Sequence, residues 1–200
     1  SYRICYYSKD VVLKNFTNSL LFKLSRYVPH VITTKRKVYA VRLSDKNLAS
    51  ELLKLSPSYK TNPRHYQSKS SYLSEIQPSI KFIKSANAAT QKWCIRFALS
   101  TDGCISMSRR GIAELNLACC NPKLVEEWLE LFEEYGINGN IGRNKSYWGG
   151  ISGIRIYDPQ SIKNFYKIGG FVPEVLISSK SKRYKGLEKN RLLLQAIVGS

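Results

Sequence analysis

Apolar residues in the second half of the chain recur with two different periods, which separate strands from helices. Alternation and β-forming residues over Gly103–Arg109 and Ile112–Cys120 predict a hairpin with a tight turn between them. A second alternating pair, Gly139–Lys145 and Gly150–Tyr157, predicts a second hairpin. We therefore expect two pairs of antiparallel strands in this half.

Helical spacing appears before, between and after these hairpins. Ser85–Asp102 carries apolar residues on one helical face. Asn121-Pro122 suits an N-cap followed by a first helical position, and five apolar residues continue at helical spacing behind it. Asp158 is expected to cap a short helix, and a final helix is expected at Lys185–Ile197. The predicted order of this half is α-β-β-α-β-β-α.

The first half shows a shorter version of the same order. A strand is expected at Tyr2–Tyr7, a helix at Asp10–Arg26, a hairpin at His30–Leu43 and a helix at Asp45–Leu55. The leading helix and first strand of the second half have no counterpart here. The pattern predicts an α+β protein with two related subdomains.

An internal repeat relates the two halves at an offset of 113 residues. At this offset Tyr7 falls on Cys120 and Arg42 falls on Arg155, and one gap-free alignment covers nearly fifty residues. Few positions are identical, so a chance match of apolar periodicity is the alternative. We expect an incomplete first repeat at 1–57, a connecting segment at 58–84, and a second repeat at 85–200 that begins with the helix 85–102.

Composition narrows the class of partner. The 32 Lys and Arg residues exceed the 14 Asp and Glu residues by 18 charges, and the sequence pI is 9.8. Such a charge on a chain that is 43% hydrophobic favours a folded protein with a polyanionic partner. No apolar run approaches the roughly 20 residues of a membrane span, and no signal-peptide pattern is present. We expect no membrane partner, no secretion, and a cytoplasmic (prokaryotic) or organellar location.

The five cysteines form no C-x-x-C pair and are an odd number. We expect buried thiols in a reducing compartment.

The acid Asp102 is a candidate functional residue, because it ends a predicted helix immediately before Gly103. A carboxylate at the negative end of the helix dipole is unfavourable and suggests a nearby positive group such as a metal ion. A solvated turn is the alternative.

The stretch Ile95–Gly103 resembles the LAGLIDADG motif, and the order of elements behind it resembles that of the LAGLIDADG homing endonucleases of the two-repeat, monomeric type. This resemblance implies two saddle-shaped antiparallel sheets that lie in the DNA major groove, with two motif helices packed together at the centre. The chain departs from the motif at Phe97, where the family has a small residue, and at Ser100, where an acid is common. Asp102, the acid before the final glycine, is present.

The resemblance also implies the chemistry of the site. It assigns a magnesium ion (Mg²⁺) to Asp102 together with a neighbouring backbone carbonyl, which we take as that of Gly103. It places Asn121 where a polar residue orders solvent, although a helix cap is an equally good explanation. It places Lys180 or Lys182 where a lysine polarises the site, although a solvated lysine is the simpler alternative.

At the 113-residue offset, the partner of Asp102 would lie about eleven residues before Ser1. We therefore expect a sequence that is truncated at its N-terminus or that has lost its first motif. In the second case cleavage by a monomer is in doubt. Two chains that pair through the 85–101 helix, as family members with one motif do, would bring two Asp102 carboxylates together.

Basic residues gather at the predicted hairpins in both halves. Arginine pairs with guanine edges, whereas lysine mostly neutralises phosphates. For each residue alone, a solubilising surface charge is the alternative. The candidate DNA-binding residues are Lys35, Arg36, Lys37, Arg42, Arg109, Arg110, Arg143, Lys145 and Arg155.

These observations and the resemblance together predict a site-specific, Mg²⁺-dependent endonuclease of double-stranded DNA, of the intron- or intein-associated homing type. The alternative on the same scaffold is a protein that binds nucleic acid without cleaving it, such as a maturase for intron RNA or a DNA-binding regulator. An RNA-binding or ribosome-associated protein of unrelated α+β fold would explain the charge but not the repeat.

Overall fold

The computed structural model describes residues 2–59, 68–74, 77–178, 181 and 183–199. The first half contains β1 (Arg3–Ser8), α1 (Val11–Ser25), β2 (His30–Thr33), β3 (Tyr39–Ser44) and α2 (Lys46–Leu55). Two short helices follow in the connecting segment, α3 (Lys69–Ser74) and α4 (Lys81–Lys84). The second half contains α5 (Ala88–Thr101), β4 (Gly103–Met107), β5 (Ala113–Ala118), α6 (Pro122–Glu133), β6 (Asn140–Arg143), β7 (Ile151–Ile156), α7 (Pro159–Lys167) and α8 (Lys189–Val198).

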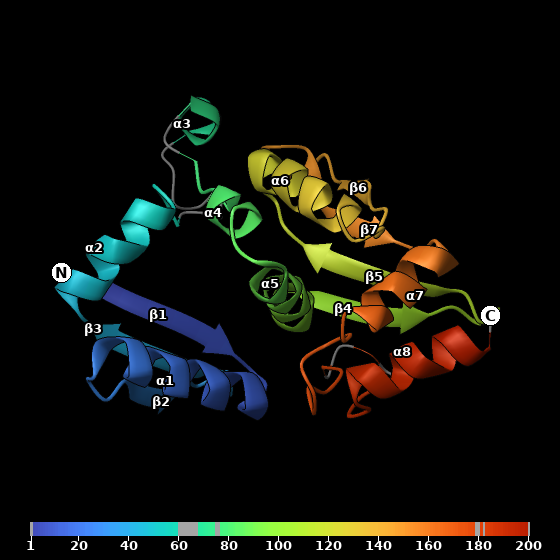
Figure 1. Cartoon of the computed structure of the whole chain (residues 1–200), viewed down its shortest axis with the longest axis horizontal. Helices are drawn as coiled ribbons and strands as arrows, with labels where there is room; N and C mark the ends of the chain where they lie inside the picture. Colours follow the sequence, from blue (N-terminus) through green and yellow to red (C-terminus); the bar gives the residue numbers. More distant parts are fainter. Residues whose placement is uncertain (1, 60–67, 75–76, 179–180, 182, 200) are drawn as a thin grey trace.

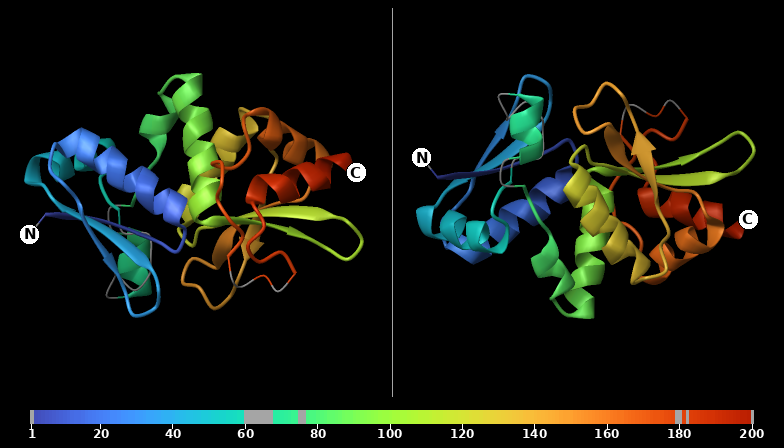
Figure 2. Two further views of the ribbon diagram at one scale, coloured as in Figure 1. Left: turned by 90° about the horizontal axis from the view of Figure 1, so that it is seen from below. Right: turned by 90° about the horizontal axis from the view of Figure 1, so that it is seen from above.

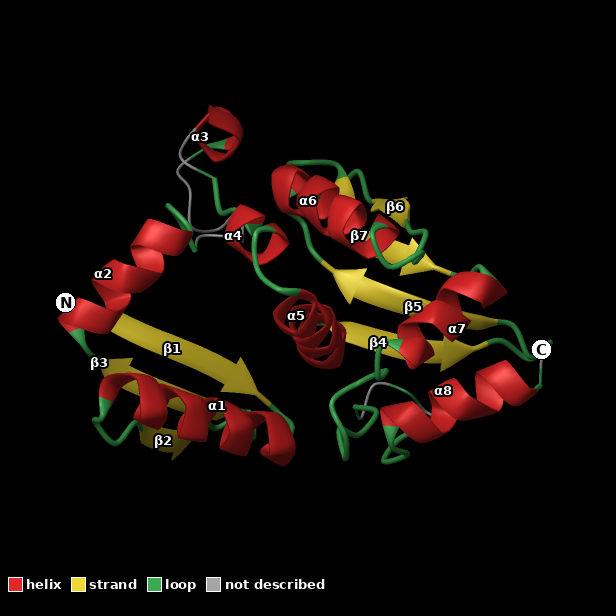
Figure 3. Ribbon diagram, in the orientation of Figure 1, coloured by secondary structure: helices red, strands yellow, loops and turns green. Residues whose placement is uncertain are grey.

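Two antiparallel sheets, one in each half, confirm the predicted α+β fold. The first sheet has the strand order β1-β3-β2, and the second has the order β4-β5-β7-β6. The three strands of the first sheet thus match β5-β7-β6, and β4 is the additional strand of the second half. Apart from the short α3, the helices lie on one side of both sheets, and α5 lies between the two halves (Figures 1, 2 and 3).

The repeat is real, but its offset is not uniform. The N-caps Asp45 and Asp158 are 113 positions apart, as predicted, whereas the N-caps Asp10 and Asn121 are only 111 apart (121 − 10). The gap-free alignment is therefore wrong around β1 and the start of α1. The difference arises in the second hairpin, because Arg155 lies 15 residues after its strand partner Asn140, whereas Arg42 lies 12 residues after His30; the segment before β6 is one residue shorter than its counterpart.

Most of the hydrophobic core lies in the second half. There α5, α6, α7 and α8 cover one face of the four-stranded sheet, and residues such as Ile95, Leu115, Ile154 and Phe165 are fully buried. The core of the first half is smaller and is built around Leu21, Val41 and Leu43. With three strands and two helices, this half has fewer apolar side chains to bury.

The two halves are joined by an aromatic contact on α5. Phe97 packs against Tyr6 and Phe16, with ring centroids 6.3 and 5.4 Å away, and Trp93 contacts Phe16 edge-on at 5.4 Å. Val172 and Val175 join the same cluster around Leu13 of α1. The large residue at the motif position of Phe97 therefore serves to dock α1 and β1 of the first half onto α5.

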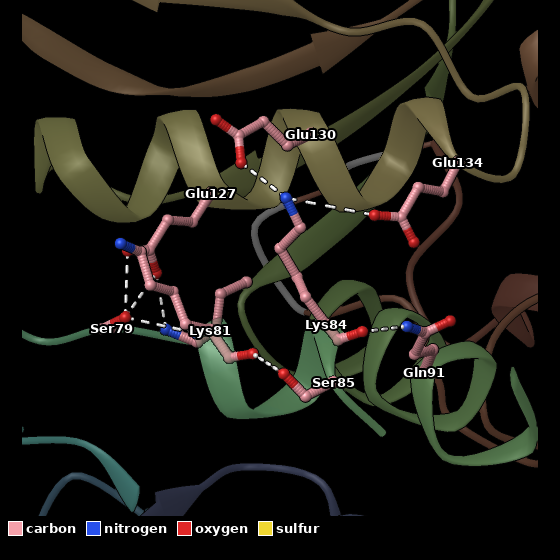
Figure 4. A network of polar contacts seen from close by, with 9 residues as sticks. Ser79, Lys81, Lys84, Ser85, Gln91, Glu127, Glu130 and Glu134 are labelled. Atoms are coloured by element: carbon pink, nitrogen blue, oxygen red, sulfur yellow. Dashed lines mark hydrogen bonds and ion pairs between the residues drawn. The ribbon is translucent and has the colours of Figure 1, made fainter. Parts of the chain in front are cut away.

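The connecting segment is fixed to the second half through α6 (Figure 4). Glu127 is buried and accepts hydrogen bonds from the Ser79 hydroxyl, at 2.9 and 3.0 Å, and from the Ile80 backbone N–H at 2.6 Å. Lys84 forms an ion pair with Glu130 at 2.7 Å. These contacts hold α4 against α6 and so set where α5 begins.

The structure corrects the predicted start of the final helix and the predicted burial of two cysteines, and it bears on the expectation about membrane spans. The final helix begins at Lys189 rather than Lys185, because residues 183–186 form a turn and Gly186 has a φ of 80°. The cysteines are free thiols, but Cys5 and Cys104 are exposed rather than buried, because they lie on the polar faces of the sheets. None of the helices in the described part of the chain has the length and hydrophobicity of a transmembrane span.

Candidate active site and nucleic-acid interface

The C-terminal end of α5 is tied to the segment that follows α7. The Arg96 guanidinium donates from Nε to the Gly170 carbonyl at 3.1 Å and from Nη2 to the Phe171 carbonyl at 3.3 Å. The Ser100 hydroxyl accepts from the Val172 N–H at 2.8 Å. Ser100 is buried, so the motif position that often carries an acid has a structural role here.

Asp102 directly follows α5 and is the metal ligand predicted from the sequence. It is the C-cap of α5; its N–H donates to the Ala98 carbonyl at 3.0 Å, and its carbonyl accepts from the Ala118 N–H at 3.0 Å. The residue is exposed. Crowding by surrounding protein raises the pKa of its carboxyl above the ordinary value, and the charge of Lys189 opposes this shift. Asp102 thus presents a carboxylate to solvent at a fixed point of the backbone.

Lys189, the first residue of α8, supplies the positive charge that the sequence predicts at this helix end. Its side chain is buried, and Nζ donates to the carbonyls of Ser100 at 2.8 Å, Gly103 at 2.7 Å and Leu99 at 3.4 Å. Burial lowers the pKa of Lys189 to about 8, while the charges of Cys104, Asp10 and Asp102 act to raise it. The ammonium group satisfies the Leu99 and Ser100 carbonyls, which the end of α5 leaves without an intrahelical partner, and the Gly103 carbonyl at the start of β4.

Lys189 is not among the site residues predicted from the sequence, although the sequence carries a signal for it. Lys189 precedes Leu192, Leu193 and Ala196 at spacings of three, four and seven residues, which places it on the buried face of α8. A lysine on the apolar face of a helix requires a buried partner. The predicted lysines, Lys180 and Lys182, lie outside the described residues.

Gly103 permits the close crossing of α5 and the second sheet. A Cβ atom on Gly103 would meet the Leu99 carbonyl oxygen at 2.4 Å and the Asn116 carbonyl oxygen at 2.9 Å, so no other residue fits. One lone pair of its carbonyl is occupied by Lys189. Within the described residues, no group of three or more His, Cys, Asp or Glu side chains could hold a metal ion. A metal proposal at this helix end therefore rests on the Asp102 carboxylate rather than on a preformed cluster of three ligands.

Asn121 is fully buried and serves as the N-cap of α6. Its Oδ1 accepts from the Leu124 N–H at 3.0 Å, and its Nδ2 donates to Gln77 Oε1 at 2.6 Å. Both polar atoms of the side chain are thus in use away from solvent. Of the two explanations that the sequence leaves open, these contacts support the helix cap.

The candidate DNA-binding residues occupy two kinds of position. Most lie exposed at hairpin turns or strand ends: Lys35, Arg36 and Lys37 between β2 and β3, Arg109 and Arg110 between β4 and β5, and Arg143 and Lys145 at the end of β6. The other two, Arg42 and Arg155, lie within strands. The turn residues reach beyond the sheets, whereas the strand residues lie on their surface.

Arg42 and Arg155 occupy equivalent places on the two sheets. Arg42 is paired across the strands with Cys5 and His30, and Arg155 with Asn116 and Asn140. We call these sets the first and the second polar row. Their strand neighbours, Val41, Leu43, Ile154 and Ile156, point to the helix-covered faces and are buried. Both polar rows therefore lie on the faces that no described helix covers, which fixes the register that the sequence leaves open (Figure 2).

Comparison with known proteins agrees with this geometry. Residues 90–170 match the family model described as the LAGLIDADG-like domain. The chain is similar in structure to the homing endonuclease I-WcaI bound to its DNA recognition sequence, with a TM-score of 0.52, 12% identity, and coverage of 86% of this chain and 73% of that chain. Comparison with curated proteins finds no match to the sequence. Residues 90–170 therefore match a LAGLIDADG-like domain, and the fold of the chain is similar to that of a homing endonuclease.

Proposed function

We propose that this protein is a site-specific endonuclease of double-stranded DNA, of the homing type, that depends on a divalent metal ion. The observation that carries the proposal is the position of Asp102 at the end of α5, between two sheets whose open faces carry equivalent arginines. The structurally similar homing endonuclease is bound to DNA, and the net charge of +18 suits the same partner here.

The donor chemistry at Asp102 fits Mg²⁺. This ion takes one or two carboxylates and completes its shell with waters and substrate phosphates, so a single exposed carboxylate is an adequate protein ligand. A bound ion would supply positive charge to the phosphate and lower the pKa of a coordinated water. Lys189 holds the carbonyls on both sides of Asp102 and thereby fixes the carboxylate relative to the second sheet.

A protein that binds nucleic acid without cleaving it is the second candidate, and one observation favours it. Among the described residues, no group of three or more His, Cys, Asp or Glu side chains could hold a metal ion. Cleavage of both strands at one site uses two scissile phosphates, and paired metal-ligand sets suit that task better than one. A maturase for intron RNA or a DNA-binding regulator would need the sheets and their charge but not Asp102.

The test compares cleavage by the wild-type chain, Asp102→Asn and Asp45→Asn on a plasmid library of random target sites. Asp45→Asn is a matched control, because it removes one carboxylate charge while asparagine can still cap α2. We expect double-strand cuts with Mg²⁺ for the wild type and the control. We expect Asp102→Asn to bind DNA equally well without cutting. Salt-sensitive binding with no cleavage by the wild type would instead support the second candidate.

A further inference from the structure

One acidic residue lies on the open face of the second sheet, among residues that are otherwise neutral or basic. Glu114 of β5 is half-buried, and its Oε1 accepts a hydrogen bond from Asn116 Nδ2 at 2.9 Å. The same oxygen forms an ion pair with Arg155 Nε at 3.7 Å. Glu114 therefore contacts two members of the second polar row at once.

Arg155 is confined from the opposite side by Gly142 of β6. A Cβ atom at Gly142 would lie 3.5 Å from Arg155 Nε, so the guanidinium occupies the space above this glycine. Glu114 approaches the same nitrogen from β5. The contacts engage Nε and leave the two terminal amino groups of Arg155, which are the atoms that can pair with O6 and N7 of a guanine.

The first sheet has the opposite charge at the corresponding place. The 111-residue offset that relates Asp10 to Asn121 also relates Arg3 to Glu114, and Arg3 is exposed on the same face as Arg42. The first sheet thus carries two arginines where the second carries Glu114 and Arg155. The two sheets share a backbone plan but differ in electrostatics at one equivalent pair of positions.

We propose that Glu114 is a specificity-determining residue of the second sheet, an inference that rests on the proposed DNA-binding function. Its charge repels DNA phosphates in any sequence, which lowers affinity for random duplexes. Its contacts orient Arg155 for guanine and Asn116 for adenine, so that binding to the correct bases compensates for the repulsion. The first sheet, with Arg3 and Arg42 and no acid in the polar row, contributes general affinity for the phosphate backbone.

The test selects bound sequences from a library of random DNA duplexes with the wild-type chain, Glu114→Gln and Glu133→Gln. Glutamine at 114 can still accept from Asn116 but loses the ion pair with Arg155. Glu133→Gln removes the same charge from an exposed position of α6, on the helical side of the molecule. Equal melting temperatures of the three proteins show that folding is unchanged.

We expect the wild type and Glu133→Gln to enrich the same motif. Glu114→Gln should bind random duplexes more tightly, and its preference for guanine at one position of that motif should fall by about five-fold or more. An unchanged motif and unchanged affinity for random duplexes in Glu114→Gln would overturn this inference alone. A wild-type protein that binds duplexes but enriches no motif would overturn the proposed site-specific function, and the role of Glu114 with it.

Discussion

At the scale of single residues, Lys189 determines the geometry of the end of α5. Its ammonium group donates to carbonyls on both sides of Asp102 and lies 5.3 Å from the centroid of the Phe171 ring. Few local features of the sequence mark such a residue, because its partners lie about 90 positions earlier in the chain. Asp102 could be identified from its helix-end position and Lys189 from its place on the apolar face of α8, but no local pattern shows that this lysine neutralises that helix end.

Replacing Lys189 with methionine keeps the apolar stem and removes the three hydrogen bonds. Buried carbonyls then lose their partner, so we expect the free energy of unfolding to fall by about 2–3 kcal/mol. Chemical denaturation followed by circular dichroism measures this change. Lys185→Met is the control, since Lys185 is exposed, and it should change the stability by less than about 0.5 kcal/mol. Equal stabilities of the two variants would contradict the role assigned to Lys189.

At the scale of elements, local signals located most helices correctly and long-range contacts explain the exceptions. Asn121 and Asp158 cap their helices, as the sequence predicts, because a cap depends on residues only two or three positions away. Asp10 and Asp45, at which the sequence begins two further helices, are also N-caps in the structure. The start of α8 was predicted four residues too early. Its true position is set by pairing with a distant segment, in which the Lys189 N–H donates to the Val175 carbonyl at 2.9 Å.

The exposure of two cysteines on the open sheet faces leads to a prediction about their alkylation rates with and without DNA. Cys5 of β1 and Cys104 of β4 are exposed on these faces. A bound DNA duplex should therefore slow their alkylation by N-ethylmaleimide. Cys94 of α5 packs against the main core and should react at the same rate with and without DNA. Mass spectrometry of each cysteine-containing peptide measures the rates, and DNA protection of Cys94 but not of Cys5 and Cys104 would place the nucleic acid elsewhere.

The alkylation rate of Cys119 in the same experiment should depend on pH in a defined way. Burial raises the pKa of this thiol to about 11, so the reactive thiolate is a minor species at neutral pH. Its fraction, and with it the alkylation rate in the absence of DNA, should rise about ten-fold for each pH unit until the pH approaches that pKa. A rate that levels off near pH 9 would show that the thiol is not shifted in the folded protein.

At the scale of the whole molecule, the internal repeat explains why so much of the architecture could be predicted. Matching hydrophobic patterns gave two matching sheets and placed Arg42 and Arg155 at equivalent positions, because β3 and β7 keep the 113-residue offset. The two-residue change at β1 could not be predicted, since loops of different length leave the apolar pattern of each element intact. Nor could the pattern alone decide which sheet face is open; the positions of the helices decide that.

In the proposed function, DNA lies across both open sheet faces with the end of α5 above the reacting phosphates. The measurement that tests it most directly maps the cut sites and the hydroxyl-radical footprint on one selected duplex in Mg²⁺. We predict two protected segments with the cuts between them, and loss of opposite segments in Arg42→Ala and Arg155→Ala. Cuts outside the protected region, or loss of the same segment in both variants, would contradict the account.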